Sequence, residues 1–441
     1  MKKTVTIIGG GLAGCEAAWQ LLRRGHRVRL YEMKPLKFSP AHKMENLAEL
    51  VCSNSLKSNL LDNASGLLKE EMRRLNSLII MAADKTALPA GSALAVDRAR
   101  FAAEVESQLL RREDFSLLRE EITEIPSDAW TIIATGPLTS DALAGALAAV
   151  MERSYLYFYD AVAPIIEADS IHMEKVFWAS RYNKGTADYL NCPLDKEEYD
   201  HLRREILAGE KVPLKSFEEV KHFEGCLPVE VLAERGEKSL AFGPMKPVGL
   251  INPRTGARPY AVVQLRRENA AGTLLNMVGF QTKLTWPEQR RIFRLIPGLE
   301  NAEFARYGSI HRNTFIHSPS LLTPSLQLKK NPRIFFAGQI TGVEGYVESA
   351  AMGLLAGLNA SFLLENKTLE PPPAATAIGA LLRYIVSPES AHHFQPMNIN
   401  FGIVETVFPS PMDKKEKKRY MVRQALESLD QWMKRQRLHA C

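Results

Sequence analysis

Two of the five cysteines stand in settings where a thiol could act as a nucleophile. Cys52 lies in a polar stretch, "LVCSNS", and Cys226 follows a glycine and precedes a Leu-Pro pair in "FEGCLP". A cysteine is usually a small buried hydrophobe, but its thiolate is a strong nucleophile where the charge is stabilised. The local sequence leaves both interpretations open, so other motifs must indicate which reaction needs a thiol.

A glycine-rich turn near the N-terminus indicates a dinucleotide site, because a predicted strand ends just before it and a predicted helix follows. Gly9 would permit the tight bend, Gly11 would let the backbone approach a pyrophosphate, and Gly14 would let the helix pack closely on the strand. The pyrophosphate would lie at the positive end of the helix dipole. Glu32 ends the next predicted strand, where an acid binds ribose hydroxyls. The predicted cofactor-binding residues of this region are Gly9, Gly10, Gly11, Leu12, Ala13, Gly14 and Glu32.

Two later stretches favour FAD over NAD as the bound dinucleotide. The stretch "TIIATG" at 131–136 resembles the strand and ATG element of two-dinucleotide-type flavoproteins, and "IFFAGQITGVEGYVESAAMG" at 334–353 resembles their late flavin-contact motif. There a helix N-terminus would face the pyrimidine edge of the flavin and stabilise negative charge on reduction. The middle of the chain shows no second GxGxxG, so an NADH or NADPH donor would need an unmarked site. These stretches add Thr135, Gly136, Gly338, Gln339, Gly342, Gly345 and Tyr346 to the predicted cofactor site.

Five stretches, in order along nearly the whole chain, resemble the TrmFO family of folate- and FAD-dependent tRNA (uracil-5-)-methyltransferases, which is related to GidA/MnmG. They are "VTIIGGGLAGCEAAWQL", "ELVCSNSLKSN", "LAVDRARFA", "FEGCLPVEVLAERGEKSLAFGPMKPVGL" and "FFAGQITGVEGYVESAAMGLLAGLNA". The larger MnmG/GidA proteins carry a longer C-terminal helical domain, for which this chain has no room. The resemblance therefore favours the TrmFO branch.

The resemblance implies methylation of carbon 5 of the T-loop uridine of tRNA with 5,10-methylenetetrahydrofolate, and reduction by FADH2 that NADH or NADPH regenerates. Carbon 5 of uracil becomes nucleophilic after a thiolate adds to carbon 6, and a base must then remove the carbon 5 proton. The folate supplies only a methylene, so a hydride must complete the methyl group. The resemblance places functional thiols at Cys52 and Cys226. We expect Cys226 to attack carbon 6 and Cys52 to handle the proton or the flavin side, although the roles could be exchanged.

Several other aromatic, cysteine and histidine residues have sequence settings that are less specific for a function. By the same resemblance, Tyr346 would stack on the flavin ring, although it could simply be an aromatic residue at a helix start. Trp286 is a candidate platform for folate or a flipped base, and core packing is nearly as good an interpretation. We expect Cys15 to pack against the sheet and Cys192 to lie in a turn-like loop. No cysteine or histidine, including His392, has zinc-site spacing, so no metal is expected.

The elements that must position these residues indicate an α/β protein: a Rossmann-type FAD-binding domain of the two-dinucleotide flavoprotein kind with an inserted α+β domain. Strands are expected at 4–8, 26–32 and 129–140, helices at 11–25, 67–82 and 97–112, and a long polar loop at 34–66. The expected domain order is 1–150 (FAD, first part), 151–310 (inserted substrate or tRNA domain), 311–370 (FAD, second part) and 371–441 (basic segment packed on the FAD domain).

Composition and charge limit the possible partners. The chain has 56 Lys and Arg against 50 Asp and Glu, a net charge of +6, which suits a polyanion without requiring one. Basic clusters at 288–294 and 413–437 are either solvated helix faces or a tRNA surface. No membrane segment is expected, and five cysteines without a CxxC pair fit a cytoplasmic protein.

Two other classes of function remain open. One is another flavin enzyme, either an MnmG-like modifier of wobble uridines or a small-molecule oxidoreductase. The other is a flavin-bearing tRNA-binding factor without catalytic activity. Methylation that depends on methylenetetrahydrofolate would separate the main interpretation from both.

Overall fold

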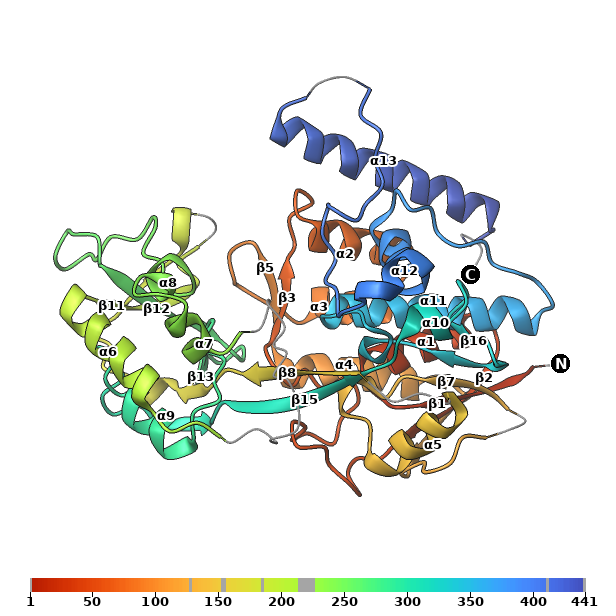
Figure 1. Cartoon of the computed structure of the whole chain (residues 1–441), viewed down its shortest axis with the longest axis horizontal. Helices are drawn as coiled ribbons and strands as arrows, with labels where there is room; N and C mark the ends of the chain where they lie inside the picture. The colour runs from red at the N-terminus through yellow and green to blue at the C-terminus, as the bar shows by residue number, and fades with distance from the viewer. Residues whose placement is uncertain are drawn as a thin grey trace.

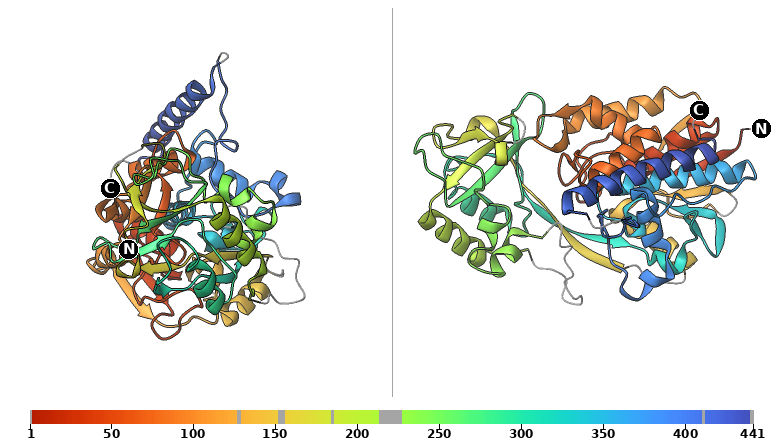
Figure 2. Two further views of the ribbon diagram at one scale, coloured as in Figure 1. Left: turned by 90° about the vertical axis from the view of Figure 1, so that its left-hand side faces the viewer. Right: turned by 90° about the horizontal axis from the view of Figure 1, so that it is seen from above.

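The computed structural model describes residues 2–126, 129–151, 156–183, 186–212, 227–409 and 412–438 of the 441. Figure 1 shows a larger and a smaller lobe, and the view from above in Figure 2 shows them joined by a two-stranded ribbon. The ribbon pairs β8 (Leu156–Val162) with β15 (Ser309–Phe315) in antiparallel register. Two segments far apart in sequence therefore carry the chain out to the smaller lobe and back.

The larger lobe is built on a six-stranded sheet in the order β16-β17-β7-β1-β2-β6. Its strands are β1 (Thr4–Ile8), β2 (Arg27–Glu32), β6 (Phe115–Arg119), β7 (Trp130–Ile133), β16 (Gln327–Leu328) and β17 (Asn331–Phe336). All neighbours are parallel except β16 and β17. The central strands are apolar and buried because helices cover the sheet. This arrangement confirms the predicted Rossmann-type α/β fold.

The helices of this lobe come from both ends of the chain. They are α1 (Leu12–Arg23), α2 (Ala64–Arg74), α3 (Leu78–Lys85), α4 (Arg98–Leu110), α5 (Asp141–Met151), α10 (Ser318–Leu321), α11 (Tyr346–Leu364), α12 (Ala377–Val386) and α13 (Lys414–Arg435). A small antiparallel sheet of β3 (Ser55–Ser58), β5 (Ala93–Val96) and β4 (Ala87–Leu88) lies beside them.

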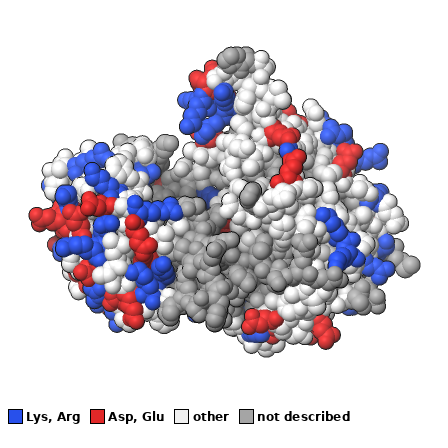
Figure 3. Space-filling model, in the orientation of Figure 1, with Lys and Arg blue, Asp and Glu red and all other residues white. Residues whose placement is uncertain are grey.

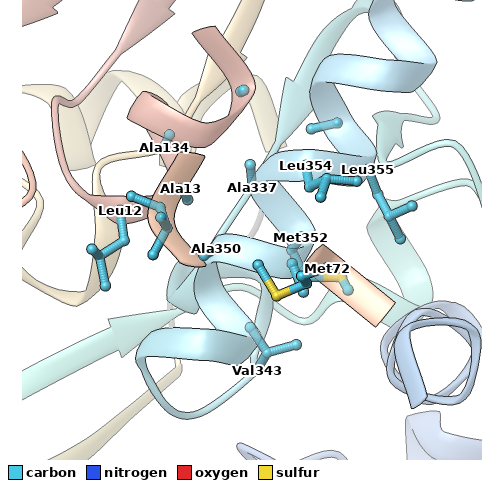
Figure 4. Close-up of a cluster of buried hydrophobic side chains, with 14 of the residues drawn as sticks. Leu12, Ala13, Met72, Ala134, Ala337, Val343, Ala350, Met352, Leu354 and Leu355 are labelled. Atoms are coloured by element: carbon cyan, nitrogen blue, oxygen red, sulfur yellow. The ribbon is translucent and has the colours of Figure 1, made fainter. Parts of the chain in front are cut away.

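The helices α1 and α11 pack closely against each other, and small residues make their approach possible. A Cβ atom on Gly353 would lie 2.2 Å from the carbonyl oxygen of Ala13, and one on Gly357 would lie 2.7 Å from that of Ala17. Figure 4 shows Ala13 beside Ala337 and Ala350 at this contact. Any larger side chain at these glycines would push the two helices apart.

The smaller lobe has its own antiparallel sheet, in the order β10-β11-β12-β13-β9-β14. Its strands are β9 (Ile165–Glu167), β10 (Phe177–Ala179), β11 (Tyr189–Leu194), β12 (Ala261–Arg267), β13 (Leu274–Met277) and β14 (Phe304–Arg306). Its helices are α6 (Lys196–Ala208), α7 (Val229–Glu234), α8 (Ser239–Phe242) and α9 (Trp286–Phe293). A core separate from that of the larger lobe lies between them. This core supports the expected division near residues 150 and 310, which stays a prediction.

Several local predictions were wrong. The single helix expected at 67–82 is two helices, α2 and α3, separated near Asn76, whose φ of 57° no α-helix tolerates. The polar stretch at 34–66 contains β3 and the start of α2. Cys192 lies in β11, fully buried opposite Val263, so burial raises the pKa of its thiol and it packs in the core.

The helix α11 is apolar and long enough to cross a membrane by composition and length alone. However, 89% of its apolar window is buried inside the protein. Its apolar residues pack against α1 and other parts of the larger core, as expected for a central helix of a globular domain.

Candidate active site

The glycine turn between β1 and α1 has the geometry that its spacing predicts. Gly9 has a φ of 104°, and a Cβ there would lie 2.6 Å from the Ala134 carbonyl oxygen. A Cβ on Gly14 would lie 1.9 Å from the Gly9 carbonyl oxygen, so this position must be glycine for α1 to meet β1. Gly11, in contrast, has no neighbouring atom within 4 Å of such a Cβ. The space above Gly11, at the start of α1, is therefore open to an anionic group.

Glu32 ends β2 directly beside this turn and is buried. Its Oε2 accepts a hydrogen bond from the Gly10 N–H at 3.0 Å, and its Oε1 accepts one from the Lys34 N–H at 3.0 Å. The carboxylate thus fixes the end of β2 against the glycine turn. It also lines the cavity that opens there.

A first cavity runs from the glycine turn across the ends of the central strands. Eleven of the fourteen predicted cofactor residues line it: Gly9, Gly10, Gly11, Leu12, Ala13, Glu32, Thr135, Gly136, Gly338, Gln339 and Tyr346. Gly14 lies beneath the turn, Gly342 packs against Phe394, and Gly345 belongs to a neighbouring cavity. The lining therefore brings together the three sequence stretches that predicted the cofactor site.

A second cavity adjoins the first and is lined in part by Cys52. The two share the lining residues Val51, Pro137, Leu138, Gln339 and Tyr346. The second is also lined by Ser53, Lys57, Gln281, Asn313, Glu344 and Asn398. A thiol thus lies in a space that continues into the predicted dinucleotide cavity.

The loop that carries Cys52 is held by its backbone. The Tyr346 hydroxyl oxygen accepts hydrogen bonds from the N–H groups of Cys52 at 2.7 Å and Ser53 at 3.2 Å. Arg306 donates to the carbonyl oxygens of Val51 at 2.9 Å and Cys52 at 3.2 Å. The Cys52 Sγ lies 3.9 Å from the Ala161 carbonyl oxygen. Tyr346, at the start of α11, and Arg306, at the end of β14, therefore fix the thiol from opposite lobes.

Burial changes the pKa values of Tyr346 and Arg306, the two residues that hold this loop. Burial raises the pKa of Tyr346, and the negative charge of a Cys52 thiolate would raise it further, so the hydroxyl stays protonated. Burial lowers the pKa of Arg306, and the charge of Arg98 acts in the same direction. Arg306 nevertheless stays charged, and its interaction with Cys52 favours the charged form of the guanidinium.

Arg98 adds a second cationic contact to the same loop. It donates to the Leu50 carbonyl oxygen and to that of Val51 at 3.4 Å. Its partner is the buried carboxylate of Glu268, so an ion pair links α4 to the segment that follows β12. Arg98 lies in the stretch "LAVDRARFA", whose local pattern predicts no role for this side chain, and no sequence signal points to Arg306.

Lys57, a lining residue of the second cavity, forms an ion pair with Glu348 of α11. Lys57 Nζ lies 2.8 Å from Glu348 Oε1, and the Glu348 side chain is fully buried in the first turn of α11. Lys57 has a φ of 62°, an uncommon conformation for a non-glycine residue. Gly345 leaves room for both groups, since a Cβ there would lie 2.3 Å from Glu348 Oε2. Sequence reasoning missed this pair because its members lie 291 positions apart.

Two of the remaining candidates, Trp286 and Cys15, do not line either cavity. Cys226 lies outside the described residues, so its position relative to Cys52 stays a prediction. Trp286 lines neither cavity and is 62% exposed, so the alternative of core packing was wrong. Cys15 is buried in α1, as expected. Within the described ranges, no group of three or more His, Cys, Asp or Glu side chains is placed to hold a metal ion.

The chain is similar to a described family and to curated proteins. Residues 4–368 match the family described as Glucose inhibited division protein A. The Methylenetetrahydrofolate--tRNA-(uracil-5-)-methyltransferase TrmFO of Syntrophus aciditrophicus is 61% identical over 430 residues, 97% of this chain and 97% of that protein. The protein of the same name from Heliobacterium modesticaldum is 58% identical over 98% of each chain.

The solved structure of Aquifex aeolicus GidA in the form II crystal matches with a TM-score of 0.69 at 16% identity, over 97% of this chain and 73% of that chain. At this identity the match shows a common fold. The identity to the curated relatives, which extends over nearly the full length of each chain, is much higher. This chain therefore belongs to the TrmFO family, within the group described as Glucose inhibited division protein A.

Proposed function

We propose that this protein methylates carbon 5 of the T-loop uridine in tRNA, with 5,10-methylenetetrahydrofolate as carbon donor and FAD as bound cofactor. The single observation that carries the proposal is the position of Cys52, in a cavity continuous with the dinucleotide cavity. The activity in the names of relatives that are 61% and 58% identical supports it. A tRNA substrate implies a cytoplasmic enzyme.

The residues of the first cavity fit FAD. The open space over Gly11 at the start of α1 suits a pyrophosphate, and Glu32 is placed for the adenosine ribose. Gln339 and Tyr346 lie where the cavity meets the thiol cavity, so the redox-active ring would lie at this junction. When bound and reduced, the flavin supplies the hydride that converts the methylene into a methyl group. NADH or NADPH would recharge it from the substrate side, without a separate nucleotide-binding motif.

The thiols make carbon 5 of uracil reactive. A thiolate adds to carbon 6, and the resulting enolate carbon attacks the folate methylene. A base then removes the carbon 5 proton as the bond from the methylene to the folate nitrogen breaks and tetrahydrofolate leaves. Hydride addition to the methylene now attached to carbon 5 completes the methyl group and expels the thiolate from carbon 6. We assign the attack to Cys226 and the proton-handling role to Cys52, and the two roles could be exchanged. The contacts of Tyr346 and Arg306 with the Cys52 loop keep the Cys52 thiol beside the cofactor cavity.

The basic N-terminal half of α13 is our candidate tRNA surface. Figure 3 shows Lys and Arg side chains gathered over the end of α13 that lies nearest the smaller lobe. Lys417 lies 5.6 Å from the Phe408 ring centre, and Lys418 lies 5.9 Å from that of Phe401. The helix is anchored to the larger lobe by Arg74, which donates to Asp430 at 2.7 Å. A phosphate backbone would therefore meet a fixed row of positive charge.

The proposed activity has a direct test. The purified holoenzyme, given tRNA that lacks the T-loop methyl group, should methylate it with 5,10-methylenetetrahydrofolate and NADH or NADPH. S-adenosylmethionine should not replace the folate. Methylation from S-adenosylmethionine, modification of a wobble uridine, or tRNA binding without methylation under all conditions would each contradict the proposal.

Two glycine variants separate cofactor binding from folding. Gly11→Ala should keep the melting temperature of the apoprotein, because its Cβ meets no atom, but should lower FAD occupancy, because the methyl group fills the pyrophosphate space. Gly14→Ala should lower the apoprotein melting temperature itself, because its Cβ would clash with Gly9. Flavin absorbance and calorimetry measure the two effects. Equal FAD occupancy in Gly11→Ala and the wild type would contradict the assigned pyrophosphate position.

Neutralising the start of α13 tests the tRNA surface. A variant with Gln at Lys414, Lys415, Lys417 and Lys418 should bind tRNA more weakly at moderate salt and show a smaller salt dependence, while its flavin content stays unchanged. Gln at Lys434 and Arg435, exposed in the last turn of the same helix, is the matched control and should have little effect. Unchanged tRNA affinity in the four-lysine variant would exclude this surface.

A further inference from the structure

A hollow on the smaller lobe combines stacked aromatic rings with arginines. It is lined by Trp286, Pro287, Arg290, Arg291, Arg294 and Tyr307. None of these residues lines the cofactor cavity or the thiol cavity. The hollow is therefore a surface apart from the two that the proposed reaction uses.

The aromatic rings in this hollow form an ordered stack. The Trp286 ring lies parallel to that of Tyr307, with centroids 5.6 Å apart and an angle of 15° between planes. Tyr307 stacks in turn on Phe304, at 5.1 Å and 20°. Phe304 packs against the buried Phe293 of the smaller core. The stack holds the indole in a fixed orientation while 62% of Trp286 remains exposed.

The arginines differ in how far their charge is neutralised. Arg291 pairs with Glu205 and Glu288, and Arg294 pairs with Glu303. Arg290 instead donates through Nε to the Tyr307 hydroxyl at 2.9 Å, and its guanidinium lies 6.0 Å from the Tyr307 ring centre. In the described part of the chain, no carboxylate lies within ion-pair distance of Arg290. Among the described residues, the guanidinium beside the aromatic stack therefore has the hydroxyl and ring of Tyr307 as its partners instead of a carboxylate.

This combination matches the chemistry of an unpaired nucleotide. An exposed indole stacks on a base of any sequence, and a neighbouring arginine binds the phosphate that follows it. A base inside a duplex is already stacked on its neighbours and presents no free face. Tyr307 also follows Arg306, which binds the carbonyl oxygens of the Cys52 loop, so the hollow is linked to the thiol cavity through adjacent residues.

We propose that this hollow binds an unpaired nucleoside of the tRNA substrate, distinct from the uridine that is methylated. Its base stacks on Trp286, and its phosphate lies beside Arg290. The inference rests on the proposed function only for the identity of the RNA. This contact, in addition to the one with the target uridine, would hold the tRNA loop open and fix the position of the target base relative to the enzyme.

The test is equilibrium binding of unmethylated tRNA to the holoenzyme, without folate or nicotinamide. Trp286→Ala should weaken binding about tenfold with an unchanged salt dependence, and Trp286→Phe should restore most of the affinity because it keeps a ring face. Arg290→Ala should weaken binding and lower the slope of log K against log salt by about one. Matched controls are Phe242→Ala, an exposed aromatic on the same lobe, and Arg258→Ala, an exposed arginine on the same lobe. Neither should change the affinity.

The outcomes separate this inference from the proposed function. Wild-type affinity in Trp286→Ala, or an equal loss in Phe242→Ala, would overturn it. A raised KM for methylenetetrahydrofolate with unchanged tRNA affinity would assign the hollow to the folate and also overturn it. Because binding is measured without turnover, an absence of methylation by the wild type would count against the proposed function alone.

Discussion

The close contact between α1 and α11 is the constraint on which the rest of the site depends. Gly353 and Gly357 let α11 approach the backbone of α1 at Ala13 and Ala17, and Gly14 lets α1 approach β1 in turn. The helix α1 follows β1, the first strand of the chain, and α11 follows β17, the last strand of the same sheet along the chain. Both helices begin at the same cavity. Their positive ends therefore converge on one space, where a dinucleotide can use both.

This packing also sets the position of the thiol. Tyr346 is the first residue of α11, and its hydroxyl accepts the N–H groups of Cys52 and Ser53. Arg306 holds the same loop from the smaller lobe. The loop thus lies where the two lobes meet, and its cavity shares Gln339 and Tyr346 with the cofactor cavity. A substrate that enters between the lobes would reach the thiol and the cofactor together.

Sequence reasoning predicted the parts that depend on local geometry and missed those that depend on distant contacts. The spacing of Gly9, Gly11 and Gly14 predicted the first turn because a strand–turn–helix unit requires small residues at those places. Periodicity alone did not show that Cys192 lies in a strand. Cys52 was singled out by family resemblance. Its partner Arg306 lies 254 positions away, and no local pattern marks such a pairing.

The central claim is that a cysteine thiol of this protein adds to carbon 6 of the uracil ring. The most direct measurement uses tRNA with 5-fluorouridine at the target position, because fluorine at carbon 5 prevents the proton loss that completes the reaction. We expect the wild type, with methylenetetrahydrofolate and NAD(P)H, to form a stable covalent enzyme–tRNA complex. We expect it to be lost in Cys226→Ala if Cys226 attacks carbon 6, or in Cys52→Ala if the roles are exchanged. A complex that persists when both cysteines are replaced, or an active wild type that forms none, would contradict this claim.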